Sequence, residues 1–152
     1  MTDLQKVYDL FLDQITDDMY MEITKEETAD LLFSLFKNAL PWFEFPRFSL
    51  FDFDEELQIH NADLTIEEMR IISNYMIVEW MGQQLATIEL TRLKYSGSDF
   101  KFTSQANHMH KLMKLREEYK NNGFHLQRLY KRRKADENGI MRSTFGSIMS
   151  SN

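Results

Sequence analysis

The chain has no cysteine among its 152 residues, and it has little proline and glycine. Without cysteine, a disulfide scaffold, a thiolate zinc site and a cysteine nucleophile are excluded, and the sequence suits a reducing compartment. Two prolines and five glycines are too few for long loops or for the many turns of an all-β protein. No apolar run approaches the roughly 18 residues that span a bilayer. The acidic beginning, Met1-Thr2-Asp3, differs from the positively charged start of a signal peptide.

The sequence also lacks the motifs of a catalytic or cofactor-binding site. It contains no phosphate-binding glycine loop and no G-x-S-x-G motif. The pair His108 and His110 would point about 200° apart on a helix, whereas helical metal ligands are three or four residues apart. Glu67, Glu68 and Glu79 are better explained by helix capping and solvation than as a catalytic acid pair. We therefore predict no enzyme activity, no catalytic or metal-binding residues and no cofactor; a hydrolytic enzyme would require an unexpected metal.

What is present is a composition typical of one globular domain. Hydrophobic residues make up 43% of the chain and charged residues 28%, and the length is sufficient to bury a core. Ten methionines and twelve phenylalanines are many for this length. They favour an adaptable core or an apolar surface for a partner, since methionine side chains repack easily.

Two capping boxes mark the beginnings of predicted helices over residues 25–39 and 66–93. They are Thr24-Lys25-Glu26-Glu27 and Thr65-Ile66-Glu67-Glu68. In each box the threonine hydroxyl can accept from the N–H three residues on, and a glutamate can reach back to the threonine N–H. The first helix is expected to end before Pro41, because proline has no N–H and disfavours helix at the preceding residue.

The predicted helix over 66–93 is apolar on every side. This pattern is typical of a central helix that is surrounded by others, or that a neighbouring subunit also covers. Residues 3–15 have apolar side chains at helical spacing and predict a shorter amphipathic helix. Residues 42–63 interleave aromatic and polar side chains and predict a loop or short extended piece. Its aromatic residues could belong to the core, to a contact between subunits or to the loop itself.

The C-terminal third begins with a predicted turn at 95–99, followed by the strand-like alternation of residues 100–102. A helix is expected over about 105–121. The sequence Asn121-Asn122-Gly123 predicts its end, since asparagine and glycine are favoured just after a helix. A basic segment follows at 124–134.

The predicted fold class is mainly α: a small helical bundle around a long central helix, with a short extended or loop segment. We predict the bundle domain over residues 1–123. Residues 124–152 are predicted to be a basic C-terminal segment and a flexible tail, because the composition turns polar and small after Ala135.

Charge is divided unevenly along the chain. Residues 1–90 hold 5 Lys/Arg against 19 Asp/Glu, and residues 91–152 hold 13 against 5. The basic region 92–134 has three interpretations: a solvated terminus, a surface that binds the phosphates of nucleic acid, or a surface that docks on an acidic protein. The acidic first 90 residues would repel nucleic acid unless they face elsewhere.

Four segments carry a resemblance to a known family: residues 75–81, 94–100, 103–108 and 126–133. Over roughly residues 1–134 the chain resembles the head–tail connector, or adaptor, proteins of tailed bacteriophages. The resemblance implies a helical bundle that forms a ring, often of twelve copies, beneath the portal, with the genome passing through its lumen. It also implies that the C-terminal part docks into the portal, and that there is no enzymatic activity and no cofactor.

We therefore expect a structural protein of the virion neck, assembled in the host cytoplasm, with the portal, a tail-side neck or stopper protein and other copies of itself as partners. Double-stranded DNA would pass it transiently, and no membrane is involved. The alternative is a nucleic-acid-binding helical module that uses residues 92–134. The residues expected to contact the portal are Phe124, Leu126, Arg128, Leu129, Tyr130, Lys131, Arg132, Arg133, Lys134, Ile140 and Phe145. Those expected to join neighbouring subunits are Trp80, Lys94, Tyr95, Phe100, Lys101 and Phe102.

Overall fold

The computed structural model describes the backbone of residues 1–15, 25–94 and 99–132. It describes the side chains of residues 1–15, 28–90 and 106–132. These residues are mainly helical, as the sequence predicts. The helices are α1 (Gln5–Gln14), α2 (Lys25–Ala39), α3 (Ile66–Lys94), α4 (Asp99–Arg132) and the short 3-10 helix η2 (Leu40–Trp42). Three two-residue strands, β1 (Thr2–Asp3), β2 (Phe53–Asp54) and β3 (Ile59–His60), form a small sheet.

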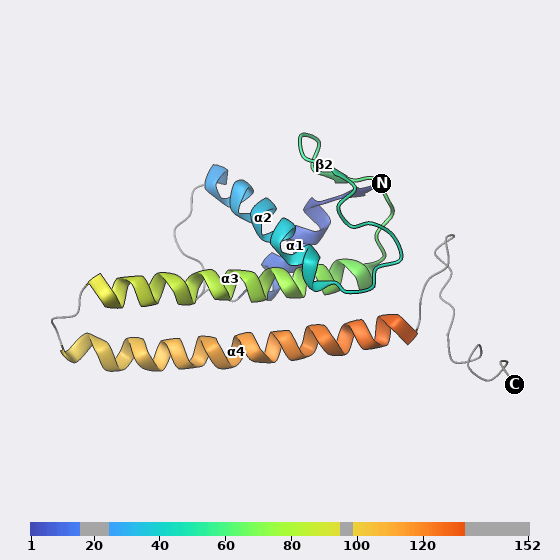
Figure 1. Ribbon diagram of the computed structural model, residues 1–152. Coiled ribbons are helices and arrows are strands. Elements are labelled where there is room, and N and C mark those ends of the chain that lie inside the picture. The colour runs from blue at the N-terminus through green and yellow to red at the C-terminus, as the bar shows by residue number, and fades with distance from the viewer. Residues whose placement is uncertain (16–24, 95–98, 133–152) are drawn as a thin grey trace, which may run out of the picture.

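Helices α3 and α4 form a long antiparallel pair and lie side by side (Figure 1). Helices α1 and α2 pack on the opposite side of α3, toward its N-terminal half, and the small sheet lies on this side as well. The first half of α3 is therefore enclosed by the rest of the chain. Its second half extends beyond α1 and α2, and Leu90 there is 66% exposed.

The first half of α3 is the centre of the core. Every residue from Ile71 to Val78 is buried, which requires neighbours on all sides of the helix. The predicted central helix is thus confirmed, although only this half is enclosed. The predicted capping box is also confirmed: the Glu68 N–H donates to Thr65 Oγ1 at 3.2 Å, and the Thr65 N–H donates to Glu68 Oε2 at 2.7 Å.

Helix α2 has the predicted bounds, and the chain tightens into η2 where Pro41 prevents a regular helix from continuing. The corresponding capping residue, Thr24, lies outside the described residues. Beyond η2, residues 43–63 form mainly loop and turn with the two short strands β2 and β3, as predicted. Strand β3 pairs antiparallel with both β1 and β2, with Thr2 and Phe53 opposite His60. The participation of residues 2–3 in this sheet was not predicted.

Helix α4 corrects the predicted organisation of the C-terminal third. Residues 100–102 are helical rather than extended, and the helix continues through Asn121-Asn122-Gly123 to Arg132. A Cβ atom on Gly123 would lie 2.5 Å from Tyr75 Cζ, so this glycine permits the close approach of α3 and α4. The predicted helix end is therefore wrong. Residues 124–132 are part of α4 and pack on the bundle.

Candidate docking cleft and its buried support

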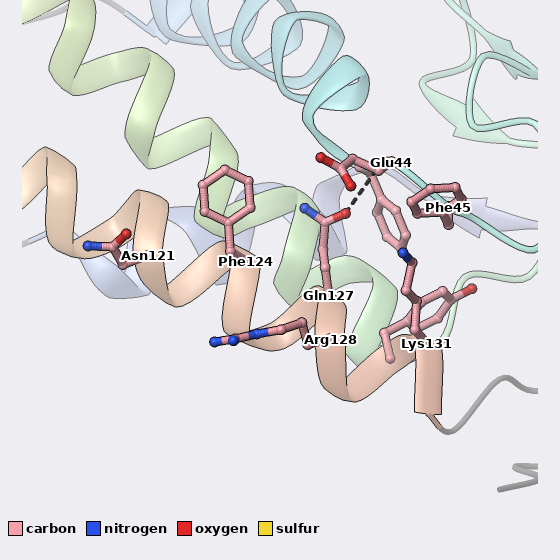
Figure 2. Close-up of a pocket in the computed structure, with 9 residues that line it drawn as sticks. Glu44, Phe45, Asn121, Phe124, Gln127, Arg128 and Lys131 are labelled. Carbon is pink, nitrogen blue, oxygen red and sulfur yellow. Dashed lines mark hydrogen bonds between the residues drawn. The ribbon is translucent and has the colours of Figure 1, made fainter. Parts of the chain in front are cut away.

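A cleft of 440 Å³ lies beside the last turns of α4, where the chain leaving η2 runs along the helix (Figure 2). Its volume is within the range of pockets that receive a ligand or a side-chain anchor, about 300–1,000 Å³. Two segments that are far apart in sequence form its walls. The lining residues are Phe43, Glu44, Phe45, Asn121, Phe124, Gln127, Arg128, Tyr130 and Lys131.

The rim of the cleft combines exposed aromatic rings with charge that is positive on balance, because Arg128 and Lys131 outnumber Glu44. Phe45 and Phe124 are 49% and 42% exposed, which is unusual for phenylalanine. Arg128 and Lys131 are exposed beside them, and Lys131 Nζ lies 3.6 Å from the centroid of the Phe45 ring. Such a cation–π contact holds the ring at the rim, where about half of the side chain stays exposed. Aromatic residues and arginine are enriched at protein interfaces, so the rim has the chemistry of a docking surface.

The base of the cleft is fixed by Gln127, which is buried. Its Nε2 donates to the Trp42 carbonyl oxygen at 2.9 Å and to Tyr75 Oη at 2.6 Å, and its Oε1 accepts from the Glu44 N–H at 2.9 Å. These bonds attach the chain after η2 to both α3 and α4. Trp42 and Tyr75 also stack, with ring centroids 5.3 Å apart and planes at 11°. The two walls of the cleft are therefore held in a defined relation to each other.

A second buried network lies behind the cleft and centres on Glu68. Glu68 Oε1 accepts from Tyr130 Oη at 2.8 Å and from Arg47 Nε at 2.7 Å, while Oε2 accepts from Arg47 Nη2 at 3.2 Å. The Arg47 N–H donates to Tyr130 Oη at 3.2 Å. The hydrogen bond to Glu68 raises the pKa of Arg47 above its ordinary value. Each of these groups is satisfied by others in the fold, so the network joins α3, α4 and the chain after η2.

Three buried tyrosines make the fold sensitive to alkali. Burial raises the pKa of Tyr8, Tyr75 and Tyr130 above the ordinary value of 10.0, and the hydrogen bond to Glu68 raises that of Tyr130 further. The folded state thus favours the neutral phenol, whereas the unfolded chain ionises near pH 10. Stability is fully present below that pH and falls as the pH rises through it toward the folded-state pKa.

We expect Tyr8 and Tyr130, whose pKa values are raised most, each to lower the free energy of unfolding by up to about 1.4 kcal/mol per pH unit above pH 10. Denaturant unfolding at stepwise higher pH, followed together with tyrosinate absorbance, measures this. The Tyr8→Phe variant is the control, because it removes one of the three titrations and should give a shallower fall. A free energy of unfolding that is flat up to pH 11 would contradict the expectation.

The structure distributes the residues expected at the portal among different environments. Phe124, Arg128, Lys131 and Arg132 are exposed, and Leu126 and Leu129 are partly buried. Tyr130 is buried in the core, so its assignment to a surface contact is corrected. The remaining members, Arg133, Lys134, Ile140 and Phe145, lie outside the described residues.

Of the residues expected to join subunits, only Trp80 has a described side chain. Trp80 is buried in the core of its own chain, and its contact with a neighbouring subunit stays a prediction. Tyr95 lies outside the described residues. Lys94, Phe100, Lys101 and Phe102 are helical, but their side chains are outside the described set.

Sequence reasoning missed the wall of the cleft that residues 43–45 supply. The signal was present in the interleaved aromatic residues of 42–53, whose roles were left open. The structure divides them: Phe43 is buried, Trp42, Phe48 and Phe53 are partly buried against the core, and Phe45 and Phe51 are exposed. Glu68 and Arg47 were also missed as partners of Tyr130, because their contacts join residues more than 20 positions apart.

Within the described ranges, no group of three or more His, Cys, Asp or Glu side chains is arranged to hold a metal ion. His108 and His110 are both exposed on α4. None of the helices in the described part of the chain is long and apolar enough to cross a membrane.

Comparisons with known proteins identify no relative of this chain. No family model matches it, and neither the curated proteins nor the solved structures contain a match.

Proposed function

We propose that this protein is a structural connector of a tailed-phage virion, a helical subunit that assembles into a ring between the portal and the tail. The observation that carries the proposal is the cleft at the end of α4, where exposed Phe45 and Phe124 adjoin Arg128 on a rigid helical support. Such a surface on a helical body is suited to assembly with other proteins. The resemblance of four segments to connector proteins supplies the kind of assembly.

A protein partner accounts for this region better than nucleic acid does. Phosphate binding needs a row of positive side chains that are available to the polymer. On α4, Arg116 instead donates from Nε to the Val78 carbonyl oxygen at 3.1 Å, and Lys120 pairs with Glu117 at 3.0 Å. Part of the basic charge of this helix therefore serves the fold, while the aromatic rings remain exposed.

In the proposed ring, the portal contact is made by residues 133–152 together with the end of α4. Helix α4 ends at Arg132 at the edge of the bundle, away from the tip of the α3–α4 pair (Figure 1). Residues beyond this point begin where they can reach a partner without displacing the core. The acidic first 90 residues would keep the body of the ring from adhering to the DNA that passes it.

The test is a deletion of residues 133–152, which leaves every helix of the described structure intact. We expect the shortened protein to stay folded by circular dichroism and to lose binding to its cognate portal protein. Rings of defined symmetry on the portal, seen by electron microscopy with the full chain, would support the proposal. A deletion that binds portal at full strength would overturn the assignment of this contact.

A longer deletion from residue 124 is the structural comparison. It removes Gln127 and Tyr130 from the core, and so we expect it to lose helical structure as well as binding. The alternative function is tested on the full chain by titration with DNA at two salt concentrations. Micromolar binding that collapses with salt, without affinity for the portal, would favour the nucleic-acid module over the connector.

A further inference from the structure

We propose that the cleft receives the β2–β3 turn of a second copy of this chain, so that copies join head to tail. By this name we mean residues 51–58, which comprise β2, the two residues before it and the turn at 55–58 that leads to β3. The proposal rests on the proposed ring and names the contact that builds it. Under it, Phe124, Arg128 and Lys131 belong to the contact between subunits, and the portal contact is left to Arg132 and the residues that follow.

The cleft defines the chemistry of its occupant. The exposed rings of Phe45 and Phe124 call for an apolar anchor, because covering them removes apolar surface from water. Arg128 and Lys131 at the rim call for acidic groups beside that anchor, since complementary charge steers association and fixes its register. The occupant should therefore be a short acidic segment that carries large apolar side chains.

The β2–β3 turn has this composition. Phe51 and Leu57 are 63% and 66% exposed and lie near the two ends of this segment. Between them lie four exposed acidic residues, Asp52, Asp54, Glu55 and Glu56. Large apolar side chains set among acidic ones are the counterpart of aromatic rings set among basic ones.

The turn is also held in one conformation. Asp54 Oδ1 accepts from the N–H groups of Glu56 and Leu57, both at 2.9 Å. Gln58 has a positive φ of 54°, which is uncommon for a residue with a side chain. Its side chain accepts from Tyr8 Oη at 2.7 Å and donates to the Glu55 carbonyl oxygen at 2.7 Å. A turn fixed in this way loses little conformational entropy on binding.

The two surfaces lie apart on one molecule, so a chain cannot fill its own cleft. The β2–β3 region lies on the side of α3 away from α4, whereas the cleft lies at the end of α4 (Figure 1). A contact between two different surfaces is heterologous: it closes a ring when the rotation between copies allows, and otherwise it builds an open filament. The pairing of turn with cleft therefore has the head-to-tail character that a connector ring requires.

The experiment uses two full-length variants with complementary defects. The turn variant carries Glu56→Lys and Leu57→Ser, neither of which removes a side-chain hydrogen bond of the turn. The cleft variant carries Phe124→Ala and Arg128→Glu. Self-association is measured by analytical ultracentrifugation over a concentration series, with and without cognate portal. We expect each variant alone to weaken self-association about 100-fold or more, because each loses an apolar anchor and reverses a charge.

The mixture is the decisive sample. The turn variant retains an intact cleft and the cleft variant an intact turn, so an equimolar mixture should form dimers and nothing larger. The matched control is Glu89→Lys with Leu90→Ser, which makes the same changes on α3, where Leu90 is also 66% exposed. This control should associate as the unaltered chain does.

Several results would overturn the inference. The unaltered chain could stay monomeric both alone and with portal. The mixture could form no dimers, or the turn variant could still form rings. Loss of portal binding by the cleft variant alone would assign the cleft to the portal instead. If the unaltered chain forms rings that do not bind the portal, the result would count against the proposed function. It would leave the contact between turn and cleft standing.

Discussion

Replacement of Gly123 with alanine is expected to lower the free energy of unfolding by about 2 kcal/mol or more. The new Cβ would lie 2.5 Å from Tyr75 Cζ, 2.7 Å from Tyr75 Oη and 2.8 Å from Asn74 Nδ2. These atoms cannot withdraw easily, because Tyr75 stacks on Trp42 and accepts from Gln127, and Asn74 donates to the Tyr119 carbonyl oxygen. Overpacking of this kind costs about 1–3 kcal/mol, occasionally more.

Whether Gly123→Ala lowers or raises the free energy of unfolding shows whether close packing or helix propensity dominates at this position. Alanine is a better helix former than glycine by about 1 kcal/mol, so a glycine in an unconstrained part of α4 would become more stable on replacement. Gly82→Ala is the matched control on α3. Its Cβ would meet the end of the Arg116 side chain at 3.2 Å, and that flexible end can move. We expect the control to change stability by less than about 1 kcal/mol.

The measurement is urea unfolding of both variants, followed by circular dichroism. A Gly123→Ala protein that is as stable as the unaltered chain, or more stable, would mean that α3 and α4 do not approach as closely as the structure has them. The bulkier Gly123→Leu variant extends the test, because its larger side chain should destabilise the pair further.

Local signals predicted the helices well where the local sequence decides the structure. The capping box of Thr65 and Glu68 forms within four residues, and it placed the beginning of α3 correctly. Pro41 ended α2 for an equally local reason. The burial around the first half of α3 could also be predicted, because an apolar circumference must be covered by something.

The end of α4 could not be predicted in this way. Asn121-Asn122-Gly123 is a common helix stop, but here Asn122 and Gly123 make distant contacts within a continuing helix. Asn122 Nδ2 donates to Asn74 Oδ1 at 3.0 Å, and Gly123 lies against Tyr75. These partners are almost 50 residues away, and so tertiary packing outweighs the local preference.

Only half of the candidate site was visible in the sequence. The basic and aromatic residues of α4 stood out by their composition, but residues 43–45 join them through contacts across more than 80 positions, as between Glu44 and Gln127. The identity of a residue also does not give its direction on a helix. Tyr130 and Lys131 are neighbours in sequence, yet the first is buried and the second exposed, because successive residues point about 100° apart.

Removal of the Glu68 carboxylate has the largest expected effect on stability, a loss of about 3–5 kcal/mol for Glu68→Ala. Glu68 is buried and accepts hydrogen bonds from Arg47, from Tyr130 and from the Thr65 N–H. Its loss leaves the partly buried Arg47 guanidinium without its carboxylate and removes half of the capping box. Breaking such a pair from one side is strongly destabilising, because an uncompensated charge remains.

The neighbouring Glu67→Ala variant is the control, since both residues lie in the first turn of α3 and both would lose a favourable interaction with the helix dipole. We expect this control to lose less than about 1 kcal/mol in thermal or urea unfolding. The loss of stability in Tyr130→Phe should lie between those of Glu68→Ala and Glu67→Ala. This variant removes one hydroxyl that donates to Glu68 and accepts from the Arg47 N–H. Similar losses for Glu68→Ala and Glu67→Ala would mean that the buried network adds nothing beyond the helix dipole.

The Glu68 network also links stability to the cleft, because it joins Arg47, just beyond one wall, to Tyr130 in the other. When the carboxylate is absent, the last turns of α4 and the chain after η2 lose a shared anchor, although Gln127 still connects them. Hydrogen exchange of Glu68→Ala should therefore accelerate most at residues 124–132 and 43–48, and less at the buried centre of α3. Uniform acceleration over the whole chain would indicate that Glu68 supports the fold generally. Faster exchange confined to residues 124–132 and 43–48 would show that the pair of Glu68 and Arg47 holds the walls of the cleft in place.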